Sequence, residues 1–161
     1  MPGMVWKPDV TVAAVAERDG KFLLVEERAS GRIVINQPAG HLEDGETFID
    51  AVVRETLEET AWRFQPQAIV GVYVWRPEHL SRTFLRVAFA GELGGHDAAR
   101  PLDHGILRTR WLTREQLSAP QSRLRSPLVL QCVDDYLSGV RHPLSLISHL
   151  IPAPSSLAAS G

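Results

Sequence analysis

The chain has 161 residues, of which 44% are hydrophobic and 22% charged, an ordinary composition for a soluble globular protein. Its formal net charge of -2 excludes an overall positive field of the kind that recruits nucleic acid or an anionic membrane. Any anionic ligand must therefore be held by local cations, either a metal ion or arginines, because Lys7 and Lys21 are the only lysines. The arginine bias suits phosphate binding, and it is equally compatible with genome composition.

Cys132 is the single cysteine, so no disulfide can form within the chain and a reducing compartment is the simpler interpretation. It lies in an apolar helical pattern, which indicates a core thiol rather than a nucleophile. No early apolar stretch follows a basic region as in a signal peptide, and no apolar run approaches transmembrane length. We expect a cytoplasmic protein, a monomer or homodimer, that binds neither membranes nor nucleic acid.

The first part of the chain is predicted to form two buried strands, at 10–16 and 20–27, separated by an Asp-Gly turn. A second turn at 29–32 leads into residues 33–42, which we expect to run into an irregular loop.

One strongly patterned helix follows this loop. Thr47 and Asp50 make a start that resembles a capping box. We expect the helix to end near Ala61, since Pro66 lies soon after. Apolar residues at four-residue spacing predict the buried face, namely Ile49, Val53, Leu57 and Ala61.

The second half of the chain predicts strands at 68–75, 82–93 and 106–113, with a loop at 94–105 and a short helix at 113–117.

A last helix is predicted to start with Ser126 as N-cap and Pro127 at its first position, and to end before Gly139. Residues 151–161 are small, polar and Pro-containing, and we expect a disordered tail. Strands interrupted by one helix, with another at the end, predict an α/β fold in which helices enclose a mixed sheet, as one domain over 1–150.

The first helix places three carboxylates on one face. At about 100° per residue, Glu55, Glu58 and Glu59 span an arc of roughly 100°. Like charges four residues apart destabilise a helix, and carboxylates near its negative end gain nothing from the macrodipole. A hard divalent ion with oxygen ligands would offset this repulsion. The alternative is an ordinary solvated acidic face.

The neighbours of the three glutamates favour a metal site over a solvated face. Arg54 precedes them and can pair with a carboxylate. The loop 40–45, with a glycine at each end, feeds directly into the same helix, and Glu46 lies at their junction. A loop that can approach a phosphate closely, beside clustered carboxylates, predicts a site for a diphosphate and magnesium.

This arrangement resembles the signature of the Nudix hydrolases. The residues that carry the resemblance, at the family's spacing, are Gly40, Glu46, Arg54, Glu55, Glu58 and Glu59. Two positions depart from the family pattern: Thr56 replaces an aliphatic residue and Ala61 replaces a glycine. We expect a partly buried hydroxyl at Thr56 and an altered helix end at Ala61.

Further segments between Trp6 and Leu150 resemble the NudJ-type phosphatase branch of that family. The resemblance implies a Nudix-type α/β/α sandwich that removes a terminal phosphate from nucleoside di- or triphosphates, or from the hydroxymethylpyrimidine diphosphate of thiamine metabolism. One alternative is a pyrophosphohydrolase that releases pyrophosphate or splits a bridged dinucleotide. Another is a nucleotide-binding module without catalysis, which would be marked by loss of the signature glutamates.

The resemblance also implies roles for individual residues. Glu55, Glu58 and Glu59, with the backbone carbonyl of Ala39, would bind magnesium, or manganese in its place. Arg54 would orient these carboxylates. Two further residues would support the loop and its junction with the helix, namely Gly40 and Glu46.

The sequence offers more than one candidate for the general base. We favour Glu58 or Glu59 as the base, because Gly105 stands where the family often has a distant glutamate. Asp103 and His104 are nearby substitutes, or simply solvated loop residues.

The organic half of the substrate is expected to meet aromatic, arginine and amide side chains. The candidates are Gln37, Trp75 and Arg86, followed by Trp6 and Arg76. For Trp75, the alternative is a core aromatic at the end of a strand. Arg86 lies inside an apolar strand pattern, which favours a cleft, and the Gln37 amide is expected to contact a ring edge.

Overall fold

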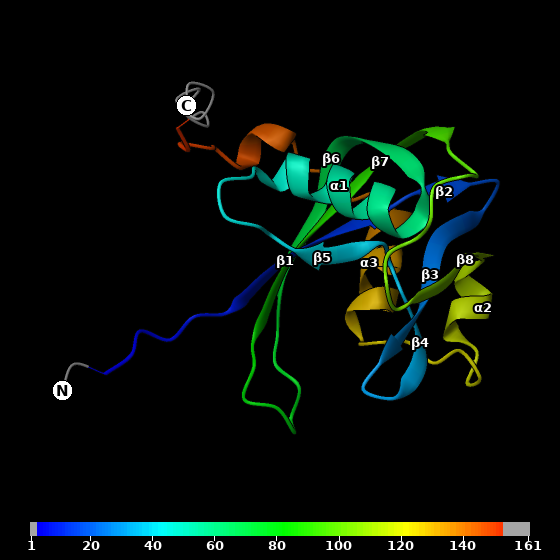
Figure 1. Cartoon of the computed structure of the whole chain (residues 1–161), viewed down its shortest axis with the longest axis horizontal. Helices are drawn as coiled ribbons and strands as arrows, with labels where there is room; N and C mark the ends of the chain where they lie inside the picture. The colour runs from blue at the N-terminus through cyan, green and yellow to red at the C-terminus, as the bar shows by residue number, and fades with distance from the viewer. Residues whose placement is uncertain (1–2, 153–161) are drawn as a thin grey trace, which may run out of the picture.

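The structure is a computed structural model that describes residues 3–152 (Figure 1). Its strands are β1 (Asp9–Val15), β2 (Glu17–Arg18), β3 (Lys21–Ala29), β4 (Arg32–Asn36), β5 (Ala39–His41), β6 (Trp62–Trp75), β7 (Phe84–His96) and β8 (Ile106–Leu112). Its helices are α1 (Phe48–Thr60), α2 (Arg114–Ser118) and α3 (Leu128–Leu137), followed by a 3-10 turn, η1 (Leu144–Leu146).

The strands form two sheets. One has the order β5-β1-β7-β6, with β1 and β7 parallel and the other pairs antiparallel. In the other sheet, β3 pairs with β2, β4 and β8, always antiparallel. The prediction of an α/β fold with a mixed sheet is therefore confirmed.

The second half of strand β1, at 12–15, is a continuous apolar run because both of its faces are buried. Val12 and Ala14 belong to the core cluster that includes α1, whereas Ala13 and Val15 belong to the cluster that includes α3. Helices thus cover both faces of the mixed sheet, as the predicted sandwich requires. Cys132 of α3 is fully buried in the second cluster, which confirms it as a core thiol.

Helix α1 starts and ends as its sequence predicts. The Thr47 hydroxyl accepts a hydrogen bond from the Asp50 N–H at 3.0 Å, and the Asp50 carboxylate accepts one from the Thr47 N–H at 3.4 Å. Ala61 ends the helix with φ of 62°, in the left-handed region that the family's glycine would occupy more easily. The substitution therefore keeps the helix end in place at some cost in backbone strain.

The predicted buried face of α1 is only partly confirmed, since Ala61 at its end is buried as expected. Val53 and Leu57 are only half-buried, whereas the helical residues that are buried are Ala51, Val52, Thr56, Glu59 and Thr60. The Thr56 hydroxyl is fully buried and donates to the Val52 carbonyl at 2.7 Å, so its polar group is satisfied. The helix is rotated so that Glu59 faces inward, against β5.

Two strand boundaries also differ from the expectation. Strand β6 begins at Trp62 rather than 68, and tolerates Pro66 because it is an edge strand whose register shifts beside that residue. Strand β7 extends through His96, so the first residues of the expected loop at 94–105 are in a strand. Within 33–42, the expected loop contains most of β4 and all of β5.

The last helix begins one residue later than predicted, with Pro127 as its N-cap, although the Ser126 hydroxyl accepts from the Leu128 N–H at 3.2 Å. Gly139 follows the helix with φ of 88°. Within residues 3–152, no helix is long and apolar enough to span a membrane. The expected disordered tail at 151–161 lies almost wholly outside the described residues and stays a prediction.

Candidate active site

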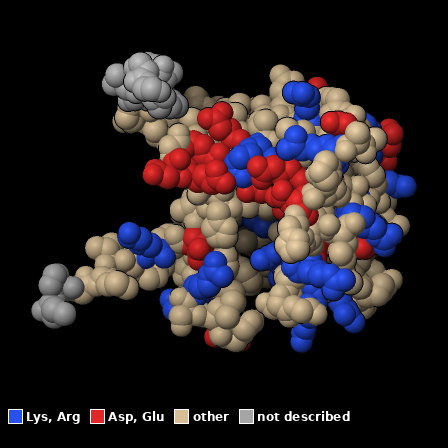
Figure 2. All heavy atoms as spheres, viewed as in Figure 1, with Lys and Arg blue, Asp and Glu red and all other residues tan. Residues whose placement is uncertain are grey.

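Three carboxylates converge at the C-terminal half of α1. Glu55, Glu58 and Asp103 each place one oxygen within 4.8 Å of the other two. Asp103 comes from the connection between β7 and β8, and its N–H donates to the Glu58 carbonyl at 2.9 Å, which fixes that connection against the helix. Acidic side chains gather over this region of the surface, with basic atoms among them (Figure 2).

Arg54 links the loop to the helix. Its Nε and Nη2 donate to the two carboxylate oxygens of Glu46, at 3.0 and 2.7 Å. Its Nη1 donates to Glu55 at 2.8 Å and to Glu58 at 3.2 Å, and Nη2 also reaches the His41 carbonyl at 3.1 Å. The hydrogen bond from Arg54 lowers the pKa of Glu46. The contacts are those expected of a residue that orients carboxylates.

The Glu55 carboxyl group packs closely against the backbone of Gly40, and this packing, rather than the backbone angles, is the reason for a glycine at this position. A Cβ at this position would lie 2.1 Å from the carboxyl carbon of Glu55, so the Glu55 carboxyl group would have to move away. Burial raises the pKa of Glu55, against the opposing effect of Arg54. Gly45, in contrast, has φ of 83° and supplies the conformational freedom expected of the loop.

Glu59 lies beneath the cluster rather than in it. Its side chain is buried, and it accepts a hydrogen bond from the Ala39 N–H of β5 at 2.8 Å. Burial raises its pKa to about 9. The three α1 glutamates do not meet at one point in the described structure, where Asp103 joins Glu55 and Glu58; that Glu59 also binds the metal stays a prediction. His104 is exposed and lies outside this group.

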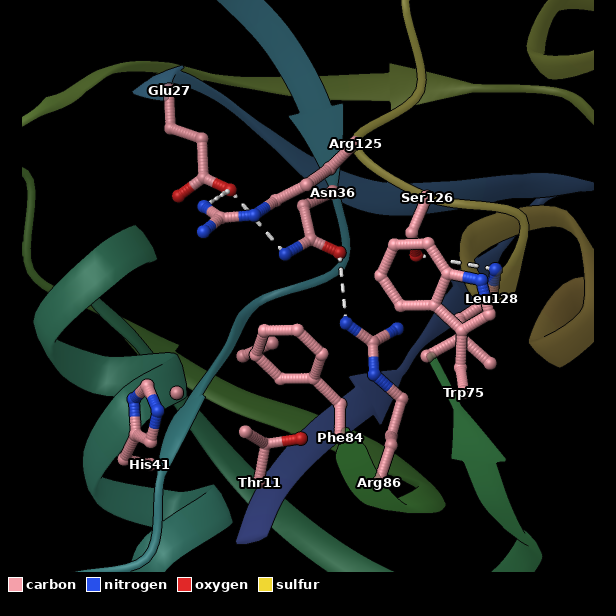
Figure 3. Close-up of a pocket in the computed structure, with 12 residues that line it drawn as sticks. Thr11, Glu27, Asn36, His41, Trp75, Phe84, Arg86, Arg125, Ser126 and Leu128 are labelled. Atoms are coloured by element: carbon pink, nitrogen blue, oxygen red, sulfur yellow. Dashed lines mark hydrogen bonds and ion pairs between the residues drawn. The ribbon is translucent and has the colours of Figure 1, made fainter. Parts of the chain in front are cut away.

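A cavity of about 180 Å³ adjoins the carboxylates (Figure 3). Gly40 contributes to its wall and also contacts Glu55, so cavity and cluster are neighbours. The residues that line it are Thr11, Glu27, Asn36, Ala39, Gly40, His41, Trp75, Phe84, Arg86, Arg125, Ser126 and Leu128.

Two of the expected substrate contacts, Trp75 and Arg86, line this cavity. Trp75 is half-buried and stacks on Phe84, with ring centroids 5.8 Å apart, so the two rings form an apolar wall. Trp6 and Arg76 are exposed and do not line the cavity.

Gln37 occupies a different position from the one expected. It is 1% exposed, and its Nε2 donates to the Val129 carbonyl at 2.7 Å. Its Oε1 accepts from Arg86 at 2.9 Å. Because both ends of the amide are used by the protein, Gln37 holds Arg86 in place instead of contacting a ring edge.

The cavity also contains residues that the sequence did not single out. Arg125 donates to Glu27 at 2.7 Å, and Asn36 donates to the same carboxylate oxygen at 3.3 Å. Glu27 is 8% exposed and lies in β3 beside two other charged residues, Glu26 and Arg28, so the sequence alone does not distinguish it. Arg125 and Ser126 lie in the segment before α3, where the sequence indicated Ser126 only as a helix cap and gave no signal for Arg125.

The residues of the cluster fit a hard divalent cation. Every side-chain donor is a carboxylate oxygen, the ligand type that magnesium and manganese prefer. Arg54 is the cation that pairs with Glu55 and Glu58 among the described residues, so it neutralises only part of the charge of the three acids.

A family model described as the NUDIX domain matches residues 6–131, from the segment before β1 into α3. The chain belongs to the Nudix hydrolases. These are enzymes that hydrolyse phosphoric anhydride bonds, so the expected class of reaction is confirmed.

Relatives match along most of the chain. Phosphatase NudJ of Escherichia coli K12 is 44% identical over 144 residues, which cover 89% of this chain and 92% of that protein. A solved Nudix hydrolase from Nitrosomonas europaea is 46% identical, with a TM-score of 0.87 over 91% of this chain and all of that one. A solved UDP-X diphosphatase, at 19% identity and a TM-score of 0.69, shares the fold.

Proposed function

We propose that this Nudix hydrolase is a magnesium-dependent phosphatase. Its substrates would be nucleoside di- and triphosphates or hydroxymethylpyrimidine diphosphate, from which it removes the terminal phosphate. The observation that carries the proposal is the 44% identity to phosphatase NudJ over 89% of the chain, well beyond the signature helix. Manganese is the alternative ion, because the same oxygen ligands accept it.

The magnesium ligands in this proposal are Glu55, Glu58 and Glu59, together with the Ala39 carbonyl. Asp103 joins them as a further ligand, since its carboxylate meets those of Glu55 and Glu58. Magnesium, when bound, would neutralise charge that accumulates on the phosphate oxygens during hydrolysis. Glu59 must lose its proton to take part, and bound cation would favour that loss.

The general base in this proposal is Glu58 rather than Glu59. The Glu58 side chain is 30% exposed and therefore accessible to an attacking water, whereas Glu59 is buried against β5 and accepts the Ala39 N–H. Glu58 would take the proton that the water loses as it attacks phosphorus. Arg54 holds the Glu58 carboxylate by a hydrogen bond of 3.2 Å, and Glu46 holds Arg54 in turn.

The cavity would take the remainder of the substrate. The wall made by Trp75 and Phe84 offers a flat apolar surface for a ring, next to the cluster that would hold the reacting phosphate. Positioning of this kind matters because phosphoryl transfer depends mainly on orientation and charge neutralisation.

The proposal is tested by incubating the purified protein with magnesium and a panel of nucleoside diphosphates, nucleoside triphosphates and hydroxymethylpyrimidine diphosphate. Orthophosphate and pyrophosphate are measured separately. Orthophosphate from the diphosphates supports the phosphatase. Pyrophosphate from triphosphates alone would indicate a pyrophosphohydrolase instead. Neither product, with intact nucleotide still bound, would indicate a binding module.

A further inference from the structure

The cavity beside the cluster contains a buried positive charge without a counter-ion. Arg86 is 6% exposed, and within the described residues it forms no salt bridge with a carboxylate. Its partners are the neutral amide oxygens of Asn36, 3.1 Å from Nη2, and of Gln37, 2.9 Å from Nη1. Its Nε is buried and has no hydrogen-bond acceptor among the described residues. Burying a charge without a counter-ion is energetically unfavourable, because no attraction to an opposite charge offsets the loss of its hydration.

The other charged residues of the cavity do not supply the missing negative charge. Glu27, the carboxylate that lines the cavity, is paired with Arg125 at 2.7 Å. Asn36 lies between Glu27 and Arg86, with its Nδ2 toward the first and its Oδ1 toward the second. The lining of the cavity therefore has an excess of positive charge centred on Arg86.

The amides hold Arg86 in one orientation. Gln37 is fixed from behind by the Val129 carbonyl of α3, so its oxygen must face the guanidinium. Asn36 is fixed in the same way by Glu27. In Figure 3, the Arg86 guanidinium points toward the Asn36 amide, in the cavity that Phe84 and Trp75 also line. A preorganised guanidinium suits an anion with several oxygens, because its donors match such a group without further ordering.

We infer that Arg86 binds a phosphoryl group of the substrate in this cavity, next to the phosphate held at the carboxylate cluster, and that Asn36 and Gln37 are its positioning residues. The inference rests on the proposed function for the identity of the anion. It makes Arg86 a residue that selects substrates with a chain of at least two phosphates, since Gly40 both lines the cavity and lies against the Glu55 carboxyl group.

The test measures binding without catalysis. Inorganic pyrophosphate is titrated by calorimetry into wild-type protein and Arg86→Met in a low-salt buffer with EDTA, so that no divalent ion contributes. We expect Arg86→Met to bind roughly tenfold to a hundredfold more weakly, the loss typical of a charged hydrogen-bond partner. Arg108→Met is the matched control, because it removes the same charge from an exposed pair with Glu26 and should bind like the wild type.

Arg86→Lys provides a second variant in case the methionine variant does not fold, which circular dichroism shows. Lysine keeps the charge but cannot span both amides, so we expect binding several-fold weaker than in the wild type. Equal affinity in the wild type and either folded Arg86 variant would overturn the inference, as would a wild type that does not bind pyrophosphate. Because no magnesium or turnover is involved, these results are independent of whether the phosphatase proposal holds.

Discussion

The carboxyl group of Glu55 occupies the space where a side chain on Gly40 would begin. A Cβ at Gly40 would lie 2.1 Å from the Glu55 carboxyl carbon and 2.2 Å from Oε1. The absence of a side chain on β5 therefore lets a carboxylate of α1 pack directly against the loop strand, at the border between cluster and cavity.

Replacing this glycine should displace Glu55. We expect Gly40→Ala to lower kcat/KM by more than roughly tenfold, with little change in the free energy of unfolding, because the displaced atoms are the end of a flexible side chain. Steady-state kinetics and urea denaturation measure the two effects. Gly95→Ala is the control, because a Cβ there meets nothing within 4 Å. Wild-type kinetics in Gly40→Ala would contradict the close packing.

Arg54→Lys tests the link between loop and helix. Lysine keeps the charge but cannot contact Glu46, Glu55 and Glu58 together, as the guanidinium does. We expect magnesium affinity and kcat/KM to fall by roughly 10- to 100-fold, as when groups that support metal ligands are lost. The experiment compares activity as a function of magnesium concentration. Arg114→Lys, which alters an ion pair with Asp134 elsewhere, should behave as the wild type.

Asp103→Asn distinguishes whether Asp103 is a metal ligand or the general base. If Asp103 is a metal ligand, the variant needs at least roughly tenfold more magnesium for half-maximal activity, and kcat recovers largely at saturating magnesium. His104→Asn, which changes an exposed neighbour outside the cluster, should leave both quantities unchanged. A large loss of kcat at unchanged magnesium affinity would instead make Asp103 the general base.

Much of this site could be predicted from the sequence because its contacts are local. The start and end of α1 follow from Thr47, Asp50 and the residues near Ala61, all within a few positions of the helix. Arg54 contacts carboxylates as expected, and one of them is that of Glu46, eight residues before it. Such features depend on capping and helical spacing, which operate over short distances along the chain.

The remaining features depend on tertiary packing. Asp103 reaches Glu58 across a connection far along the chain, and no local pattern places it there. Glu59 faces the protein interior, whereas carboxylates usually face solvent. The spacing of apolar residues in α1 therefore did not predict which face of the helix is buried. Gln37 was found as a candidate, but its partners Val129 and Arg86 lie on α3 and β7. Functional sites are where such local rules are expected to fail.

Glu59 predicts an unusual pH dependence of stability. Its pKa is raised by burial to about 9, so the folded protein holds a proton that the unfolded chain releases near the ordinary glutamate pKa of 4.5. The resulting stability is complete below pH 4.5 and is lost as the pH rises toward 9, by up to about 1.4 kcal/mol per pH unit.

The measurement is urea denaturation of the metal-free protein, in EDTA, at pH 6 and at pH 8.5. We expect a lower free energy of unfolding at pH 8.5 in the wild type. In Glu59→Gln, which keeps an oxygen for the Ala39 N–H but cannot ionise, the difference should be smaller. An equal pH dependence in both proteins would show that Glu59 is already ionised at neutral pH.

The most direct test of the account is magnesium-dependent orthophosphate release from a nucleoside diphosphate by wild type, Glu58→Gln and Glu26→Gln. Glu26 pairs with Arg108 and Arg110 outside the cluster, so its variant controls for loss of an acid. The account predicts release by wild type and Glu26→Gln only with a divalent ion, and at least a roughly hundredfold loss in Glu58→Gln. Full activity of Glu58→Gln, or release that persists in EDTA, would contradict it.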